Sequence, residues 1–238
     1  MRHLSGSELP ANPAAPNLSL SIVMITMNEE LAVATVIREI QQVVPGAEIL
    51  LVDSSKDRTA EVAASLGARV IKQFPPKGYG PAMDMALRSA SGEIIVTLDC
   101  DGSYPTAMIP VLVRELTAGG YDLVDGARLG LRSKPAAMPW MNYLANLGFG
   151  LIASAMFFRW LPDLHSGMRA YRRGLIHGLK YKAKGAALPV ELLTRPIKNG
   201  NQVKIIHIDY HERIGKSTMR PLESAWWTLK RLLGVRFS

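Results

Sequence analysis

Cysteine and aromatic side chains are scarce in this sequence. Cys100 is the only cysteine among 238 residues, which excludes an internal disulfide and any zinc site built from several cysteines. We interpret Cys100 as a packing residue. Aromatic residues make up 7% of the chain, and no homeodomain, zinc-finger or RNA-binding signature accompanies them. We therefore expect no nucleic acid partner.

Acidic residues are scarce in the second half of the chain, and the net charge of the whole is +8. Residues 1–127 contain 9 Lys and Arg against 15 Asp and Glu, a net charge of −6. Residues 128–238 contain 19 Lys and Arg against 5 Asp and Glu, a net charge of +14. This asymmetry indicates an acidic half and a half that binds anions.

Residues 1–17 lack the apolar stretch of a signal peptide, because they are polar and rich in proline and alanine. We predict a disordered leader there. Over the whole chain 48% of the residues are hydrophobic, enough to bury a core in a chain of this length.

Short apolar runs alternate with segments of helical periodicity in the acidic half. The runs at 20–26, 47–52, 69–72 and 93–97 predict buried strands with helices between them. Strands that alternate with helices through short connections form a parallel, doubly wound α/β sheet. Ligands of such sheets bind beyond the carboxyl ends of the strands.

Acidic side chains stand just beyond three of these predicted strands. They are Glu29, Asp53 and the pair Asp99 and Asp101. Each alone fits the first turn of a helix, but together they predict one ligand-binding acidic rim. Two carboxylates at the end of a buried strand are costly without a cation between them, so the pair favours a divalent metal with a phosphorylated ligand. The alternative is a loop that caps the next helix, with one acid in solvent.

The turn after the first predicted strand contains no glycine. It reads Met27-Asn28-Glu29-Glu30. The Gly-x-Gly-x-x-Gly turn that lets a backbone approach the pyrophosphate of a dinucleotide is therefore missing. This absence disfavours a Rossmann dehydrogenase.

Four short motifs follow one another through the acidic half. They are Ile25-Thr26-Met27-Asn28-Glu29, Val52-Asp53-Ser54-Ser55-Lys56-Asp57-Arg58-Thr59, Lys77-Gly78-Tyr79-Gly80-Pro81-Ala82 and Asp99-Cys100-Asp101-Gly102-Ser103-Tyr104-Pro105. In this order and spacing they resemble family 2 glycosyltransferases of the GT-A fold, in the group related to dolichyl- and polyprenyl-phosphate sugar synthases. The likeness extends more weakly to about residue 218. It implies one domain over 18–218, with a nucleotide and metal half at 18–127 and an acceptor half at 128–218.

The resemblance implies a role for each group of the acidic half. Glu29 and Asp53 would contact the nucleotide base or ribose, and Lys77 would also lie on the nucleotide side. Asp101 would bind the Mg²⁺ or Mn²⁺ that bridges the diphosphate. Asp99 would contact the ribose, the sugar or the metal.

Three departures from the family pattern surround the base. Ile25 and Met27 replace a proline and a tyrosine, and Ser54 replaces a second aspartate. Both a GDP-sugar and a UDP-sugar therefore stay open as the donor.

In the basic half the resemblance implies groups that bind the acceptor and the sugar. Arg128 would help to hold the acceptor phosphate. Ser166 and Arg169 can donate to phosphate or sugar oxygens. Glu191 matches an acid near the sugar, although an ordinary first-turn acid is the alternative.

Further strands are predicted at 121–127 and 203–208, and the second of these is followed by Arg213, Lys216 and Ser217. They resemble the group's Arg-x-Gly-x-Ser-Lys pattern with the lysine moved to 216, which implies contacts with the diphosphate.

We interpret Arg132 and Lys134 as part of a solvated loop. The residues from Lys180 to Lys184 predict a mobile basic loop.

Residues 135–158 contain no charged side chain, a length that can span a bilayer. A single crossing, however, would place the rest of the basic half on the opposite side from Asp101. We therefore predict a helix over 139–161 that lies at the membrane interface, with a buried core helix as the alternative. The tail 219–238 predicts a basic, aromatic helix that suits an anionic membrane surface or a docking contact.

The resemblance implies an inverting, metal-dependent hexosyltransferase that uses a nucleotide-diphosphate sugar. The acceptor would be a polyprenyl phosphate at the cytoplasmic membrane face, with the protein peripherally bound. Its catalytic groups would be Asp99, Asp101, Arg128, Arg169 and Glu191. A phosphate acceptor is ionised and needs no general base, whereas a hydroxyl acceptor would need Asp163, His165 or Glu191. A third possibility is a non-catalytic module that binds sugar nucleotides or lipids.

Overall fold

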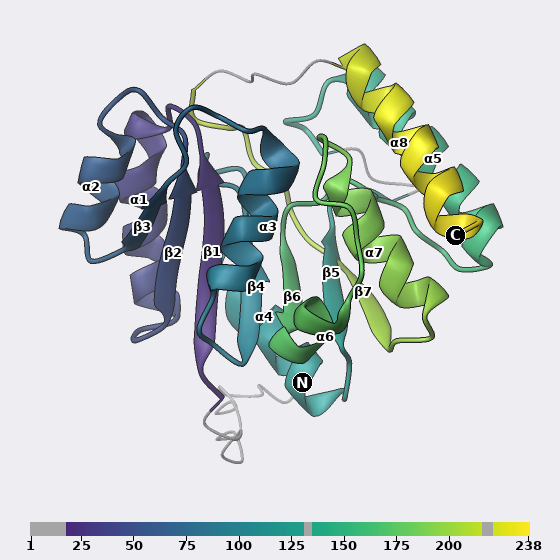
Figure 1. The fold of residues 1–238 in the computed structure, drawn as a ribbon, viewed down its shortest axis with the longest axis horizontal. Helices are drawn as coiled ribbons and strands as arrows, with labels where there is room; N and C mark the ends of the chain where they lie inside the picture. Colours follow the sequence, from purple (N-terminus) through teal and green to yellow (C-terminus); the bar gives the residue numbers. More distant parts are fainter. Residues whose placement is uncertain (1–17, 131–134, 216–220) are drawn as a thin grey trace, which may run out of the picture.

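Seven strands form one sheet at the centre of the molecule (Figure 1). The computed structural model describes residues 18–130, 135–215 and 221–238. The strands are β1 (Leu20–Thr26), β2 (Glu48–Asp53), β3 (Arg69–Lys72), β4 (Ile94–Thr97), β5 (Leu123–Ala127), β6 (Arg169–Arg172) and β7 (Val203–His207). Their order is β3-β2-β1-β4-β6-β5-β7. Only β6 runs antiparallel to its neighbours β4 and β5, so the predicted mostly parallel α/β sheet is confirmed.

Helices cover both faces of the sheet (Figure 1). One face carries α1 (Glu30–Val43), α2 (Thr59–Ser65), the short η1 (Thr106–Met108) and α4 (Ile109–Ala118). The other carries α3 (Tyr79–Ser89), α6 (Arg173–Gly178) and α7 (Leu188–Lys198). Beyond α7, α5 (Trp140–Phe157) and α8 (Pro221–Arg236) pack against each other.

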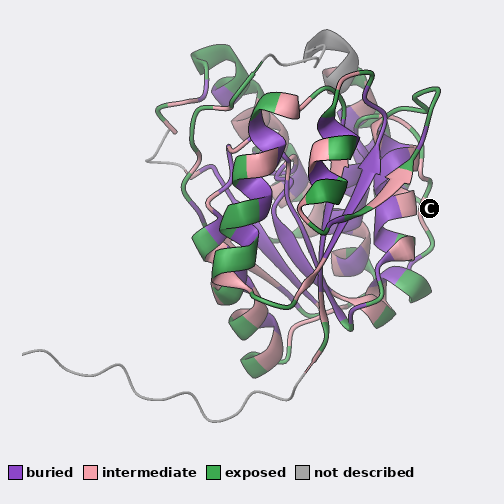
Figure 2. Cartoon of the chain, turned by 90° about the vertical axis from the view of Figure 1, so that its left-hand side faces the viewer, coloured by how far each residue is buried: buried purple, intermediate pink, exposed green. Residues whose placement is uncertain are grey.

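Side chains that alternate along each strand build two separate cores. Val23 and Leu50 face the layer of α3 and α7, while Ile22 and Leu51 face the layer of α1 and α4. This is the two-residue period expected of strands covered on both faces. Figure 2 shows the strands buried between the helices.

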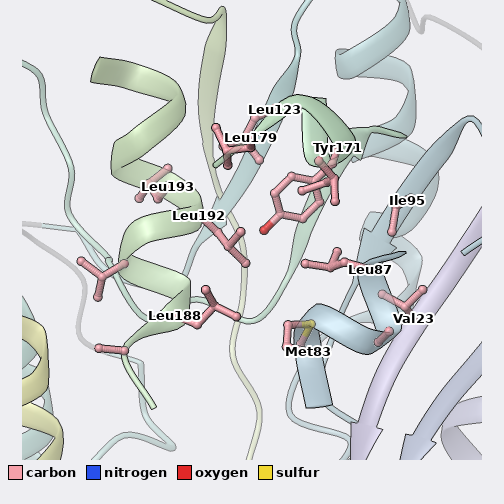
Figure 3. Close-up of a cluster of buried hydrophobic side chains, with 14 of the residues drawn as sticks. Val23, Met83, Leu87, Ile95, Leu123, Tyr171, Leu179, Leu188, Leu192 and Leu193 are labelled. Carbon is pink, nitrogen blue, oxygen red and sulfur yellow. The ribbon is translucent and has the colours of Figure 1, made fainter. Parts of the chain in front are cut away.

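The α7 layer completes the first of these cores. Leu188 and Leu192 of α7 turn toward Met83 of α3 and the ring of Tyr171 on β6 (Figure 3). All four side chains are at most 2% exposed. This packing joins the acidic half of the chain to the basic half through one core.

The strand β6 was not predicted from the sequence. It is four residues long and contains two arginines, a composition that is typical of a solvated segment. Arg169 is nevertheless 1% exposed, because its Nε donates to Oδ1 of Asp125 at 2.5 Å, its register partner on β5. Its other nitrogens donate to the carbonyls of Pro189 and Leu164.

The apolar segment predicted over 139–161 forms the helix α5 at 140–157. None of the helices in the three described ranges is long and apolar enough to cross a membrane. Most of the predicted tail helix forms α8, and the predicted leader lies outside the described residues.

We predict that Asp125→Ala lowers the free energy of unfolding by about 3–5 kcal/mol, because it leaves the buried charge of Arg169 without its partner. Urea unfolding followed by circular dichroism measures this loss. The control is Glu61→Ala, which breaks the exposed Arg58–Glu61 pair and should cost less than about 1 kcal/mol. Equal losses in both variants would contradict the structural role of the buried pair.

Candidate active site

Three carboxylates meet at the edge of the sheet where β1 and β4 end. Glu29 precedes the first turn of α1, and Asp99 and Asp101 follow β4. Arg213, which follows β7, reaches between them: its Nη2 lies 3.0 Å from Oε1 of Glu29 and its Nη1 3.4 Å from Oδ2 of Asp101. The sequence predicted the acids and the arginine, and the structure brings them into one cluster.

Asp53 is enclosed beside this cluster. It is fully buried, and it accepts hydrogen bonds from Lys72 Nζ at 2.6 Å, Thr26 Oγ1 at 2.7 Å and Ser55 Oγ at 2.5 Å. Burial alone would raise its pKa, but these hydrogen bonds outweigh it and hold the pKa below its ordinary value. Its carboxylate therefore orders the turn after β2, and the predicted contact with the base or ribose stays a prediction.

The loop after β4 presents one oxygen of Asp101. Its Oδ1 accepts from the backbone nitrogen of Ser103 at 3.0 Å and from the Ser103 hydroxyl at 2.5 Å. Its Oδ2 faces Arg213. Asp101 is thus held in place by its own loop, with one oxygen directed into the cluster.

Asp99 packs closely against the backbone at Gly167. A Cβ at Gly167 would lie 3.0 Å from both carboxylate oxygens of Asp99, so a larger residue there would require the carboxylate to shift. The loop before β6 is further held by Tyr104, whose hydroxyl accepts from the nitrogen of Gly167 at 2.6 Å. The missing side chain of Gly167 is what permits this close approach.

Crowding raises the pKa values of two members of the cluster. Burial, and then the charge of Asp101, raises the pKa of Asp99 to about 6. Burial raises the pKa of Glu29 to about 7, although Arg213 opposes the shift. Three carboxylates beside one guanidinium leave an excess of negative charge, which attracts a further cation.

A divalent cation fits this set of donors. Carboxylate oxygens are the ligands of Mg²⁺ and Mn²⁺, and Mg²⁺ typically takes one or two carboxylates and completes its shell with phosphates and water. Within the described residues, no group of three or more His, Cys, Asp and Glu side chains is arranged to hold a metal ion. Asp99 and Asp101 therefore suit a metal that shares its shell with a bound diphosphate.

Cys100 lies between these aspartates but points into the core. It is 2% exposed, and burial raises the pKa of its thiol. The interpretation as a packing residue agrees with this position.

Arg128 forms a closed clamp with Asp163. Its Nε lies 2.7 Å and its Nη2 3.0 Å from the Asp163 carboxylate, and its guanidinium lies 5.1 Å from the ring centre of Tyr210. Arg128 is 8% exposed. The sequence did not predict this clamp, because its two charged members are 35 residues apart.

The side chains of two other predicted catalytic residues are buried in ion pairs. Arg169 donates to Asp125 and to two carbonyls, as described above. Glu191 is 1% exposed and pairs with Arg195 at 2.6 Å and with Arg231 at 2.5 Å. Both residues thus take part in internal ion pairs, and the predicted contacts with the substrate stay predictions.

Other predicted residues lie at the margin of the site. Lys77 is exposed in the turn before α3, and the hydroxyl of Ser166 donates to the carbonyl of Gly126 at 2.5 Å. Lys216 and Ser217, like Arg132 and Lys134, lie outside the described residues.

We predict that the affinity for Mn²⁺ falls as the pH is lowered through 6, by about tenfold per pH unit below it. Protonation of Asp99 competes with the metal there, because a ligating carboxylate must be ionised. Calorimetric titration with Mn²⁺ from pH 5 to pH 8 measures the effect. Asp99→Asn should bind more weakly and with a flatter pH profile, and equal affinities at pH 5 and pH 7 would contradict the prediction.

Comparisons with known proteins agree with this geometry. The model of "Glycosyl transferase family 2" matches residues 21–179. A dolichyl-phosphate hexose transferase of Haloferax volcanii is 38% identical over 203 residues, which cover 85% of this chain and 87% of the relative. A dolichol-phosphate mannosyltransferase of Pyrococcus furiosus is 26% identical over 202 residues, which cover 81% of this chain and 56% of the relative.

Solved structures show the same fold. The glucosyl-3-phosphoglycerate synthase of Mycobacterium tuberculosis, in complex with Mn²⁺, UDP-glucose and phosphoglyceric acid, superimposes with a TM-score of 0.74. The match covers 92% of this chain and 80% of that one, at 24% sequence identity. Together with the family model, this GT-A-like architecture confirms the resemblance noted in the sequence: the chain belongs to glycosyl transferase family 2.

Proposed function

We propose that this glycosyltransferase moves a hexose, with inversion, from a nucleoside diphosphate to a polyprenyl phosphate. The observation that carries the proposal is the cluster of Glu29, Asp99 and Asp101 around Arg213 at the carboxyl edge of the sheet. The dolichyl-phosphate hexose transferase that matches most of the chain supports the choice of acceptor.

On the donor side, Asp101 and Asp99 would hold Mg²⁺ or Mn²⁺ with the diphosphate. The metal would supply positive charge to the leaving diphosphate. Arg213, which bridges Glu29 and Asp101, is close enough to turn toward the same phosphates. The relative solved with Mn²⁺ and UDP-glucose supports this assignment.

The candidate bases are poorly suited to a hydroxyl acceptor. Although burial opposes it, Arg128 lowers the pKa of Asp163 to about 2, and burial lowers the pKa of His165 to about 4. Such weak bases accept a proton poorly near neutral pH, and Glu191 is held by two arginines. A phosphate acceptor is already ionised and attacks the anomeric carbon without a base, so this geometry favours it.

The packed pair α5 and α8 offers a surface for a membrane. Exposed apolar side chains on α5 include Trp140, Met141, Leu144, Leu151 and Ile152, and those on α8 include Trp226, Leu229, Leu233 and Phe237 beyond its end. Large apolar groups in a strongly basic half of the chain suit an anionic lipid surface. We therefore propose peripheral binding at the cytoplasmic membrane face through these two helices.

We predict that Asp101→Asn lowers the transfer rate at least about 100-fold, because it weakens the metal site. The assay follows labelled sugar from UDP- and GDP-sugars into polyprenyl phosphate, with Mn²⁺ or with EDTA. Glu93→Gln, at the opposite end of β4, is the control and should keep the wild-type rate. Transfer that is insensitive to EDTA, or a full rate in Asp101→Asn, would contradict the metal-dependent mechanism. Transfer to polyprenol in place of polyprenyl phosphate would contradict the proposed acceptor.

We predict that the double variant Trp140→Glu, Trp226→Glu binds vesicles containing anionic lipid at least about tenfold more weakly, because two apolar anchors are lost. Co-sedimentation with the vesicles measures the binding. The control variant Leu31→Glu alters an apolar side chain on α1 that is 80% exposed, more than either tryptophan, and it should bind as the wild type does. Unchanged binding by the double variant would exclude α5 and α8 as the anchor.

A further inference from the structure

The helix α8 grips the basic loop that the sequence predicted to be mobile. Arg231 donates through Nη1 to the carbonyl of Lys182 at 2.8 Å and through Nη2 to the carbonyl of Lys184. The same Nη1 lies 2.5 Å from Oε2 of Glu191, which fixes the guanidinium in place. The planar guanidinium allows one side chain to meet two carbonyls and a carboxylate together.

The gripped loop presses against the start of α3. A Cβ at Gly80 would lie 2.9 Å from the carbonyl oxygen of Gly185 and 3.0 Å from the nitrogen of Lys184. The two backbones are therefore in direct contact, and a shift of the loop removes the support of the turn before α3. On the other side of the loop, the ring of Trp227 on α8 lies 3.4 Å from the Cβ position of Gly185.

The resemblance to family 2 glycosyltransferases places the turn supported in this way on the donor side of the site. It carries Lys77, and the partly buried Tyr79 follows at the start of α3. Tyr79 lines a small cavity together with Thr97 and Gly167. Because Gly167 abuts Asp99, this cavity adjoins both the end of the turn and a direct neighbour of the acidic cluster.

A second contact leads from α8 to the same cluster. Oγ1 of Thr228 lies 2.8 Å from Nε2 of His165. The nitrogen of His165 donates to Asp163 at 3.1 Å, and two residues later Gly167 abuts Asp99. The helix α8 therefore contacts two loops, one at Lys182–Gly185 and one at His165–Gly167, and the second of them abuts Asp99.

We propose that Arg231 is a positioning residue for the donor site. By holding the carbonyls of Lys182 and Lys184 it keeps the loop against Gly80, and so keeps the Lys77–Gly80 turn in the geometry that binds the nucleotide diphosphate. The proposal rests on the donor site proposed above. It also gives the buried Glu191 a defined task, which is to orient Arg231.

The test uses trypsin, because the carbonyls that Arg231 holds belong to two tryptic bonds, Lys182–Ala183 and Lys184–Gly185. In Arg231→Lys, cleavage at these bonds should be at least about tenfold faster. A lysine keeps the positive charge beside Glu191, but its single ammonium group cannot replace the two guanidinium nitrogens that hold the two carbonyls. The dissociation constant for UDP or GDP with Mn²⁺, and the KM for the sugar nucleotide, should rise about tenfold, with kcat changed less than about threefold.

Arg236→Lys is the matched control, because it makes the same substitution at an exposed position of the same helix. It should leave cleavage and nucleotide binding at their wild-type values. Gly80→Ala approaches the loop from the other side without touching Arg231. It should reproduce the faster cleavage and the weaker nucleotide binding, and it serves if Arg231→Lys fails to fold.

Unchanged cleavage, unchanged nucleotide binding, or a change in only one of the two in folded Arg231→Lys would overturn the proposal. Any of these three results in folded Gly80→Ala would overturn it as well. KM and kcat require an acceptor, but tryptic cleavage and the dissociation constant for the nucleotide do not. A protein that transfers no sugar to polyprenyl phosphate therefore refutes the proposed function, while the comparison of cleavage and nucleotide binding still decides the role of Arg231.

Discussion

Repulsion among crowded carboxylates is the constraint on which the site depends. The carboxyl ends of β1 and β4 bring Glu29, Asp99 and Asp101 together, and Arg213 neutralises only part of their charge. Burial first, and then the charge of neighbouring carboxylates, raises the pKa values of Glu29 and Asp99. A site of this kind gains most from a ligand that brings its own cation, which is why a metal-bound diphosphate suits it.

Buried arginines hold the surroundings of this cluster. Arg128 pairs with Asp163, Arg169 with Asp125 and Arg231 with Glu191. In each pair the two charges come from different elements, so each pair ties a loop or helix to another. The positive charge of residues 128–238 is therefore not all available to bind anions. Part of it is neutralised in these buried ion pairs.

Much of the fold followed from local pattern. Apolar runs predicted β1 to β5 and β7, and the acids after β1 and β4 predicted the cluster, because parallel strands end at one edge. The strand β6 and the clamp on Arg128 were missed. A four-residue strand that contains arginines looks solvated in the sequence, and only the presence of Asp125 and Asp163 across space makes such residues suitable for burial.

The sequence by itself determined the α/β class, the acidic edge and the separation of charge between the two halves, since these depend on periodicity and composition. The tertiary structure alone decided which charged residues face the site. Arg213 reaches the cluster from the far end of the chain, whereas Arg169 and Glu191 are turned inward. The reason is physical: a charged side chain can be buried only beside a partner of opposite charge, and the packing of distant elements decides where that partner lies.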